Sequence, residues 1–304
     1  MRNAEFEEKD FENPLYVQLL SGNICLATPG QVFEGRFGVD AALQAGHPFF
    51  WDLFGYRTIP GGINLNDYNW GWVWRDLGRR RPLPSFAINL LIQAKRPQYL
   101  SGVNATLSRL GIKHDYWRFE ISQHQHDLLA AIQRTLANRA LLIYASTAFD
   151  TYQELYEYTA NNQLVENCAY VSVPRMTEHH SWNYDHPGTS GVASSDPKPI
   201  DDPPLPAQID NLIQQASYSD DVFAQLDGLY HSVLSVSEEH ASQNPIASVY
   251  MRRNENLQAR IRDARIERHE VLPFLGVIMF FQQLSTNWFL VGGKDSVLKQ
   301  ERRS

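Results

Sequence analysis

The stretch Phe86 to Lys95 (FAINLLIQAK) constrains the fold of this chain more than any other segment. It is almost continuously apolar until Gln93. Such a run is typical of a strand whose sheet is covered on both faces. At its end, Gln93 and Lys95 are two residues apart and project from one face of the strand, while Ala94 projects from the other. A lysine at the tip of a buried strand is costly to place without a partner or a purpose. We therefore treat this tip as a candidate site.

The segments that follow alternate between helical and strand patterns. Residues 121–138 carry apolar side chains at helical spacing, and Ala140 to Ser146 (ALLIYAS) form a second apolar run. Residues 150–162 again favour a helix, and residues 168–174 (CAYVSVP) favour a strand that Pro174 ends. The order strand, helix, strand, helix, strand is typical of an α/β fold.

Two further segments suggest a division of the chain. Residues 185–206 contain six prolines with Gly and Ser, which favours a linker or an exposed loop. Beyond it, 207–242 and 246–284 have amphipathic helical patterns. We expect a main domain over 1–184, with an aromatic and Gly/Pro-rich insertion at about 44–85, and a helical C-terminal region over 207–304.

Acidic residues that suit the tip of the Gln93 strand lie far upstream. Asp40 follows Gly38 and Val39 in a short predicted strand, and Glu34 lies six residues earlier, across a turn. If the strand of Asp40 pairs with that of Gln93, then Asp40, Gln93 and Lys95 meet at one edge of the sheet. Glu34 would then lean over the same point.

These residues resemble the PD-(D/E)xK nuclease superfamily, in the variant with glutamine at the second acidic position, as in Mrr-like restriction enzymes. The resemblance rests on Glu34, on Gly38-Val39-Asp40 and on Leu91 to Arg96, and it covers roughly residues 30–175. The 52 residues between Asp40 and Gln93 exceed a simple hairpin, so an insertion must loop out. The resemblance implies a restriction-endonuclease-like core, which is a mixed central sheet flanked by helices.

The resemblance also implies a reaction, which is Mg²⁺-dependent hydrolysis of phosphodiester bonds with Mn²⁺ as a substitute. Asp40 would be the main metal ligand, joined by the Gln93 side-chain carbonyl and the Ala94 backbone carbonyl. Glu34 would bind a second metal or hold a ligand water, and Lys95 would orient or deprotonate the attacking water or support the transition-state charge. Gln125, on the following helix, is a secondary candidate. DNA is favoured over RNA, an endonuclease over an exonuclease, and defence against foreign or phage DNA is the implied role.

The charge distribution bears on partners. The net charge of −7 argues against general nucleic-acid binding, because counterion release rewards positive surfaces. However, Arg75 to Arg118 holds nine basic residues against two acidic ones, whereas Val192 to Pro245 holds nine acidic residues and one lysine. The basic segment suits a phosphate backbone or a protein partner. The candidates for holding phosphates are Arg79, Arg80, Arg81 and Arg96, although Arg79 to Arg81 equally fit a solvated turn.

Other interpretations stay open. The chain can instead be a non-catalytic nucleic-acid-binding or protein-interaction subunit that keeps the nuclease fold, and a homodimer or a regulatory protein partner is compatible with either. His124 and His126 face different directions on a helix, and His179 and His180 either touch substrate or lie in solvent. Two cysteines, no signal-like N-terminus and no uninterrupted apolar run of ~20 residues favour a cytoplasmic protein without a membrane span. We expect a buried helix and strand over Val271 to Gly293.

Overall fold

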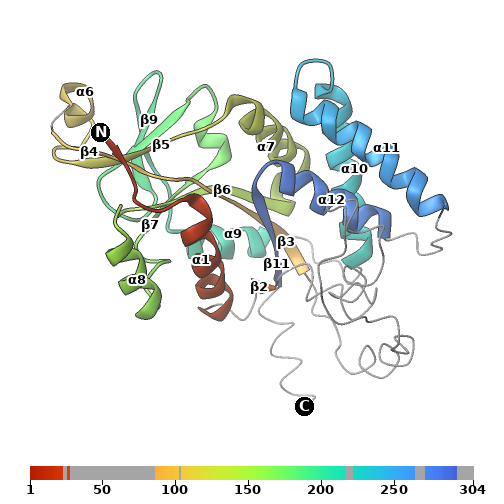
Figure 1. Cartoon of the computed structure of the whole chain (residues 1–304), viewed down its shortest axis with the longest axis horizontal. Helices are drawn as coiled ribbons and strands as arrows, with labels where there is room; N and C mark the ends of the chain where they lie inside the picture. Colours follow the sequence, from red (N-terminus) through yellow and green to blue (C-terminus); the bar gives the residue numbers. More distant parts are fainter. Residues whose placement is uncertain (23–25, 28–85, 103, 216–221, 264–270, 293–304) are drawn as a thin grey trace, which may run out of the picture.

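The computed structural model describes residues 1–22, 26–27, 86–102, 104–215, 222–263 and 271–292. Over these ranges the chain has a mixed α/β structure with two sheets (Figure 1), so the expected class is confirmed. Glu34, Asp40, Arg79 to Arg81 and the expected insertion at about 44–85 lie outside the described residues.

The central sheet has five strands, in the order β2–β11–β3–β6–β7. In chain order these strands are β2 (Leu26–Ala27), β3 (Phe86–Ala94), β6 (Ala140–Thr147), β7 (Cys168–Ser172) and β11 (Thr286–Gly292). β3 and β6 run parallel, and every other neighbouring pair is antiparallel. The sheet is therefore mixed, as expected, and the predicted strands around Gln93, Ala140 and Cys168 are all present.

Both edges of β3 are occupied. β11 pairs with it from Phe86 to Gln93, and β6 pairs with it from Asn89 to Ala94. The second partner of β3 is thus a strand near the C-terminal end of the described chain. The pairing expected with the strand of Asp40 falls on residues outside the described ranges and stays a prediction.

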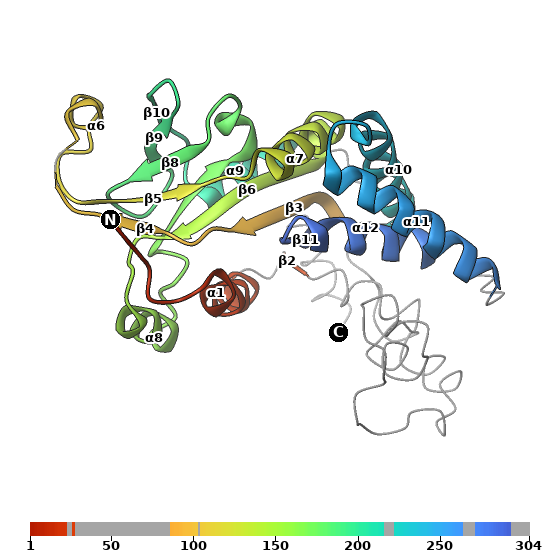
Figure 2. The ribbon, with the colours of Figure 1, turned by 45° about the horizontal axis from the view of Figure 1, so that its top comes forward.

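Helices cover both faces of the central sheet (Figures 1 and 2). The helices on one face are α1 (Glu8–Gly22), α8 (Tyr152–Ala160) and α9 (Leu205–Gln215). Those on the other are α7 (Gln123–Leu136), α10 (Val222–His240), α11 (Pro245–Asp263) and α12 (Val271–Gln283). Along β3, Leu90 and Ile92 pack in the hydrophobic core under α1, α8 and α9. Leu91 packs in the core on the other face, under α7 and α10 to α12. This double cover explains why the strand is apolar almost throughout.

Local signals set some helix boundaries. Thr151 and Glu154 form a reciprocal capping box at the start of α8, in which each side chain accepts a backbone N–H of the other residue. The Asn104 side chain caps the short helix α6 (Ala105–Arg109) by accepting from Thr106 and Leu107. Within the expected helical region 207–304, most of the described residues form the helices α9 to α12, and the described part of Val271 to Gly293 contains the expected buried helix, α12, and strand, β11.

A second, antiparallel sheet has six strands in the order β1–β4–β5–β8–β9–β10. In chain order these strands are β1 (Arg2–Asn3), β4 (Gln98–Leu100), β5 (Tyr116–Glu120), β8 (Ser181–Tyr184), β9 (Ser190–Ser194) and β10 (Lys198–Asp201). The expectation of a linker or exposed loop over 185–206 is wrong, because β9 and β10 form a hairpin within this sheet. β10 is an edge strand, where Pro199 is tolerated without its N–H.

Gly191 allows this hairpin to pack closely on β8. A Cβ atom at Gly191 would lie 2.5 Å from the Asn183 carbonyl oxygen and 2.5 Å from a ring carbon of Trp182, which is fully buried. We expect Gly191→Ala to lower the free energy of unfolding by roughly 1–3 kcal/mol, because backbone and a buried indole must both move. Urea unfolding measures the change.

Gly228→Ala is the matched control. Gly228 lies in α10, and its nearest neighbour to an added Cβ is 3.6 Å away, so alanine fits. A helical Gly→Ala change is expected to stabilise by roughly 0.5–1 kcal/mol. Wild-type stability in Gly191→Ala would contradict the close packing of the hairpin.

Candidate functional site

The tip of β3 presents the expected alternation. Gln93 and Lys95 project toward the face covered by α7 and α12, and Ala94 is buried in the opposite core. Because β3 and β6 are parallel, their C-terminal ends lie at the same edge of the sheet. Ligand sites of α/β sheets commonly form at this edge.

Hydrogen bonds hold the backbone of Lys95 in place. Its N–H donates to the Ala145 carbonyl at 2.8 Å, and its carbonyl accepts from Ser146 Oγ at 2.7 Å. The Tyr184 hydroxyl of β8 lies 2.8 Å from Ser146 Oγ and 2.7 Å from the Thr147 carbonyl, and its single proton is shared between these two oxygens. The tip of β3 is therefore fixed to both the central and the second sheet, and Lys95 starts from a defined position.

The contacts of Gln93 determine the orientation of its amide group. Gln93 Nε2 donates to the Leu284 carbonyl, just after α12, and to Gln125 Oε1 on α7 at 3.2 Å. A backbone carbonyl is only an acceptor, so the amide nitrogen must face it. Gln93 Oε1 therefore points elsewhere. This oxygen is buried and has no hydrogen-bond partner among the described residues, and the whole residue is only 2% exposed.

An unpartnered buried carbonyl oxygen is uncommon and costs free energy unless a donor or a cation meets it. Gln93 Oε1 is thus a candidate ligand atom. Gln125, the secondary candidate from the sequence, lies beside it and helps to orient it.

The Lys95 side chain is also buried, with 7% of its surface exposed. Its Nζ lies over the Tyr144 ring, 5.7 Å from the centroid, in a cation–π arrangement. Within the described part of the chain no carboxylate forms an ion pair with it. Burial lowers the pKa of Lys95, and the negative charge of Glu8 opposes that shift. Among the described residues, the site therefore contains a desolvated amine in direct contact with an aromatic face and without an ion-pair partner.

Tyr144 and His126 form the support beneath Lys95, and the sequence interpretation missed both roles. The Tyr144 hydroxyl and His126 Nδ1 are hydrogen-bonded at 2.9 Å, and the two rings stack with centroids 6.2 Å apart. Both residues are buried. The only sequence signal was a tyrosine inside an apolar strand, since a buried tyrosine hydroxyl usually needs a partner. His126 and Gln125 are consecutive on α7, so one turn of this helix serves both Gln93 and Lys95.

Arg96 has contacts other than the expected phosphates. Its guanidinium pairs with Glu7 and donates to the Ala4 carbonyl, and its backbone N–H donates to Glu8 Oε1 at 3.2 Å. These contacts attach the N-terminal segment to the end of β3. Phosphate binding by Arg96 stays a prediction, and it would compete with this structural role.

One carboxylate on the opposite side of the sheet is buried. Glu12 of α1 accepts from Tyr16 at 3.2 Å and from Asn287 of β11, and it pairs with Lys9. Asn287 lies opposite Ile92 in the β3–β11 register, so this network faces away from Gln93. Both Glu12 oxygens are engaged, which makes the residue a link between α1 and β11 rather than a further ligand at the tip.

The described ranges contain no group of three or more His, Cys, Asp or Glu side chains placed to hold a metal ion. Of the expected site, the structure brings together Gln93, Ala94, Lys95 and Gln125, while Glu34 and Asp40 lie outside the described residues. Of the two cysteines, Cys168 is buried and unpaired, and Cys25 is also outside. Across the helices that the structure describes, none is long and apolar enough to cross a membrane.

The chain was also compared with known proteins. No family model, curated protein or solved structure matches it.

The His126–Tyr144 pair predicts a pH dependence of stability. Burial lowers the pKa of His126 below its ordinary value of 6.5. Between the folded and unfolded pKa values the unfolded chain binds the additional proton, so stability is lost as the pH falls below about 6.5. We expect wild type to unfold at lower urea concentration at pH 5.5 than at pH 7.5.

His126→Asn isolates this effect, because asparagine can still bond Tyr144 but does not titrate. The variant is expected to lose less stability than wild type over the same pH interval. Identical losses in the two proteins would show that His126 is not the group responsible.

Proposed function

We propose that this chain is a metal-dependent nuclease that hydrolyses phosphodiester bonds, with DNA as the favoured substrate and Mg²⁺ as the metal. The observation that carries the proposal is the buried, unpartnered Gln93 Oε1, two residues from the buried Lys95 on one face of β3. An amide oxygen and an amine at this spacing are the two groups that the QxK motif requires. Both are held by neighbours rather than left to move.

The arrangement of elements gives further support. The order expected from the resemblance was a QxK strand, then a helix, then the strand containing Ala140 to Ser146. β3, α7 and β6 follow that order, β6 lies parallel to β3, and Gln125 of α7 reaches Gln93. The elements β4, α6 and β5 are inserted between β3 and α7. We propose that β3, α7 and β6 belong to a restriction-endonuclease-like core.

The donor atoms at the tip fit a hard divalent cation. Mg²⁺ prefers oxygen ligands, and Gln93 Oε1 is an oxygen with no other described partner. β11 pairs with β3 only as far as Gln93, so Ala94 lies one residue beyond that ladder. We propose the Ala94 carbonyl as a second ligand. Asp40 and Glu34 join the proposed ligand set through the family resemblance alone. A divalent ion bound there would acidify a bound water and offset negative charge on the phosphate.

The side chains of this chain have separate roles in the proposed reaction. Gln125 and the Leu284 carbonyl hold the Gln93 amide so that its oxygen, and not its nitrogen, faces the ligand position. Tyr144 holds Lys95 Nζ near the strand tip, where the amine can orient the attacking water or stabilise charge on the phosphate. His126 holds the Tyr144 ring. Defence against foreign DNA, action as an endonuclease and a cytoplasmic location belong to the same proposal.

The test measures cleavage of plasmid, linear duplex and single-stranded DNA with Mg²⁺, Mn²⁺ or EDTA. We expect wild type to cut plasmid DNA with Mg²⁺ or Mn²⁺ and not with EDTA. Lys95→Met and Gln93→Met remove the amine and the amide oxygen while keeping side-chain length. Each is expected to lower the rate by at least about 100-fold, and so is Asp40→Ala. DNA binding should be retained in Lys95→Met.

Lys113→Met is the matched control, because Lys113 is exposed and outside the site. It should cut DNA at the wild-type rate. Wild type that binds DNA but cuts no substrate with either metal would exclude the nuclease and favour the non-catalytic subunit. Undiminished cleavage by Lys95→Met would remove the tip of β3 from the reaction.

A further inference from the structure

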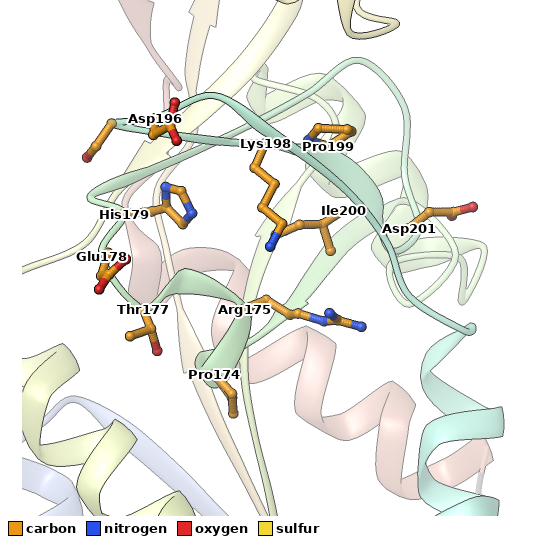
Figure 3. Close-up of a pocket in the computed structure, with 11 residues that line it drawn as sticks. Pro174, Arg175, Thr177, Glu178, His179, Asp196, Lys198, Pro199, Ile200 and Asp201 are labelled. Atoms are coloured by element: carbon orange, nitrogen blue, oxygen red, sulfur yellow. The ribbon is translucent and has the colours of Figure 1, made fainter.

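A cavity lies apart from the tip of β3, between the turn over residues 174–179 and the β9–β10 hairpin (Figure 3). Its volume is about 850 Å³, which is within the range of small-molecule sites. None of Gln93, Lys95 and Gln125 lines it. The proposed nuclease reaction therefore leaves this cavity without a role.

The two walls are fixed to each other at both ends. At one end, the His180 backbone N–H donates to the Ser194 carbonyl at 3.1 Å. At the other, Arg175 Nε donates to Asp202 Oδ1 at 2.9 Å, and the Asp202 side chain is almost fully buried. The cavity thus exists before any ligand binds, which reduces the ordering cost of binding.

Cationic groups occupy the middle of the cavity. Lys198 extends from β10 into the space, toward His179 and Arg175 of the facing wall (Figure 3). Within the described residues Lys198 has no ion pair with a carboxylate. Asp202 orients Arg175 from behind, and just over half of the Arg175 side chain remains exposed. Arginine and lysine converging on one space are a typical phosphate-binding combination.

His179 adds an unsatisfied polar atom to the same wall. The residue is nine-tenths buried, and its Nδ1 has no hydrogen-bond partner among the described residues. The preceding residue, Glu178, has a φ of 69°, a backbone angle that residues other than glycine rarely adopt. Backbone strain of this kind is often found at ligand sites. Glu178 and His179 are consecutive in the chain, and both line the cavity.

Carboxylates also line the cavity, and they limit what it can hold. Asp201 accepts from Ser190 and points away from Lys198 (Figure 3). Glu178 and Asp196 lie on the side of His179 (Figure 3). They would repel a second phosphate group, but they can accept hydrogen bonds from hydroxyl groups. The cavity therefore suits one anionic group together with neutral donors.

We propose that this cavity binds a small phosphate monoester that carries hydroxyl groups, of which a nucleoside 5′-monophosphate is the representative. Lys198 and Arg175 contact the phosphate, and Glu178 and Asp196 accept from the sugar hydroxyls. The site is separate from the tip of β3, so the inference does not depend on the proposed function.

Isothermal titration calorimetry with adenosine 5′-monophosphate, in EDTA, tests the proposal on the full chain. We expect wild type to bind with a dissociation constant of about 1 mM or lower. Lys198→Ala, at an exposed position that should not affect folding, should weaken binding by at least about tenfold. Lys113→Ala controls for the loss of a surface charge, and Lys95→Met controls for binding at β3. Both should bind as wild type does.

Adenosine, inorganic phosphate and a 5′-phosphorylated oligonucleotide complete the experiment. Adenosine and phosphate alone should each bind at least about tenfold more weakly than the monophosphate. The part of oligonucleotide binding that is lost in Lys198→Ala should be no tighter than the binding of the monophosphate. No binding of the monophosphate by wild type, or equal binding by Lys198→Ala and Lys113→Ala, would overturn the proposal. Tighter Lys198-dependent binding of the oligonucleotide would replace the free monophosphate with a strand end as the ligand.

Discussion

The strand β3 is enclosed on all sides, and the rest of the candidate site depends on this enclosure. Hydrogen-bonded neighbours occupy both of its edges, and hydrophobic cores cover both of its faces. Polar groups at its tip therefore cannot rely on bulk water and must find partners on neighbouring elements. α7 provides Gln125, β6 provides Tyr144 and Ser146, and the residue that follows α12, Leu284, provides its backbone carbonyl. Rigid elements supporting a few polar side chains are a general requirement for an accurate site.

Local periodicity was sufficient to predict the elements around the tip of β3. The apolar runs of β3, β6 and β7 and the helical spacing of α7 and α8 follow from burial, and each lies where its pattern placed it. The partner of β3 could not be predicted in this way. β11 lies almost two hundred residues downstream, and no local pattern identifies which distant strand completes a sheet. The residues of β9 and β10 were misinterpreted because prolines and glycines favour loops, whereas an edge hairpin tolerates both.

In the candidate site, too, local sequence patterns predicted some features, and others depend on tertiary contacts. The shared face of Gln93 and Lys95 follows from strand geometry, and the resemblance pointed to Gln125. Tyr144 and His126 escaped notice because an aromatic residue in an apolar strand fits a core equally well. Whether an arginine meets a phosphate or a carboxylate is a matter of tertiary structure, and for Arg96 the partner found is Glu7. The sequence also could not predict that Gln93 Oε1 lacks a described partner, because this depends on the acceptor that binds Gln93 Nε2 in the folded chain.

The contact between Gln93 and Leu284 has a consequence for the order in which the molecule matures during synthesis. A ribosome must add about 190 further residues after Gln93 before the carbonyl that orients its amide exists. Until then β3 also lacks β11 along one edge. A nascent chain, or one shortened before residue 284, therefore has the QxK sequence without the geometry that sets its amide. The orientation of the Gln93 amide is therefore set only after residue 284 has been synthesised.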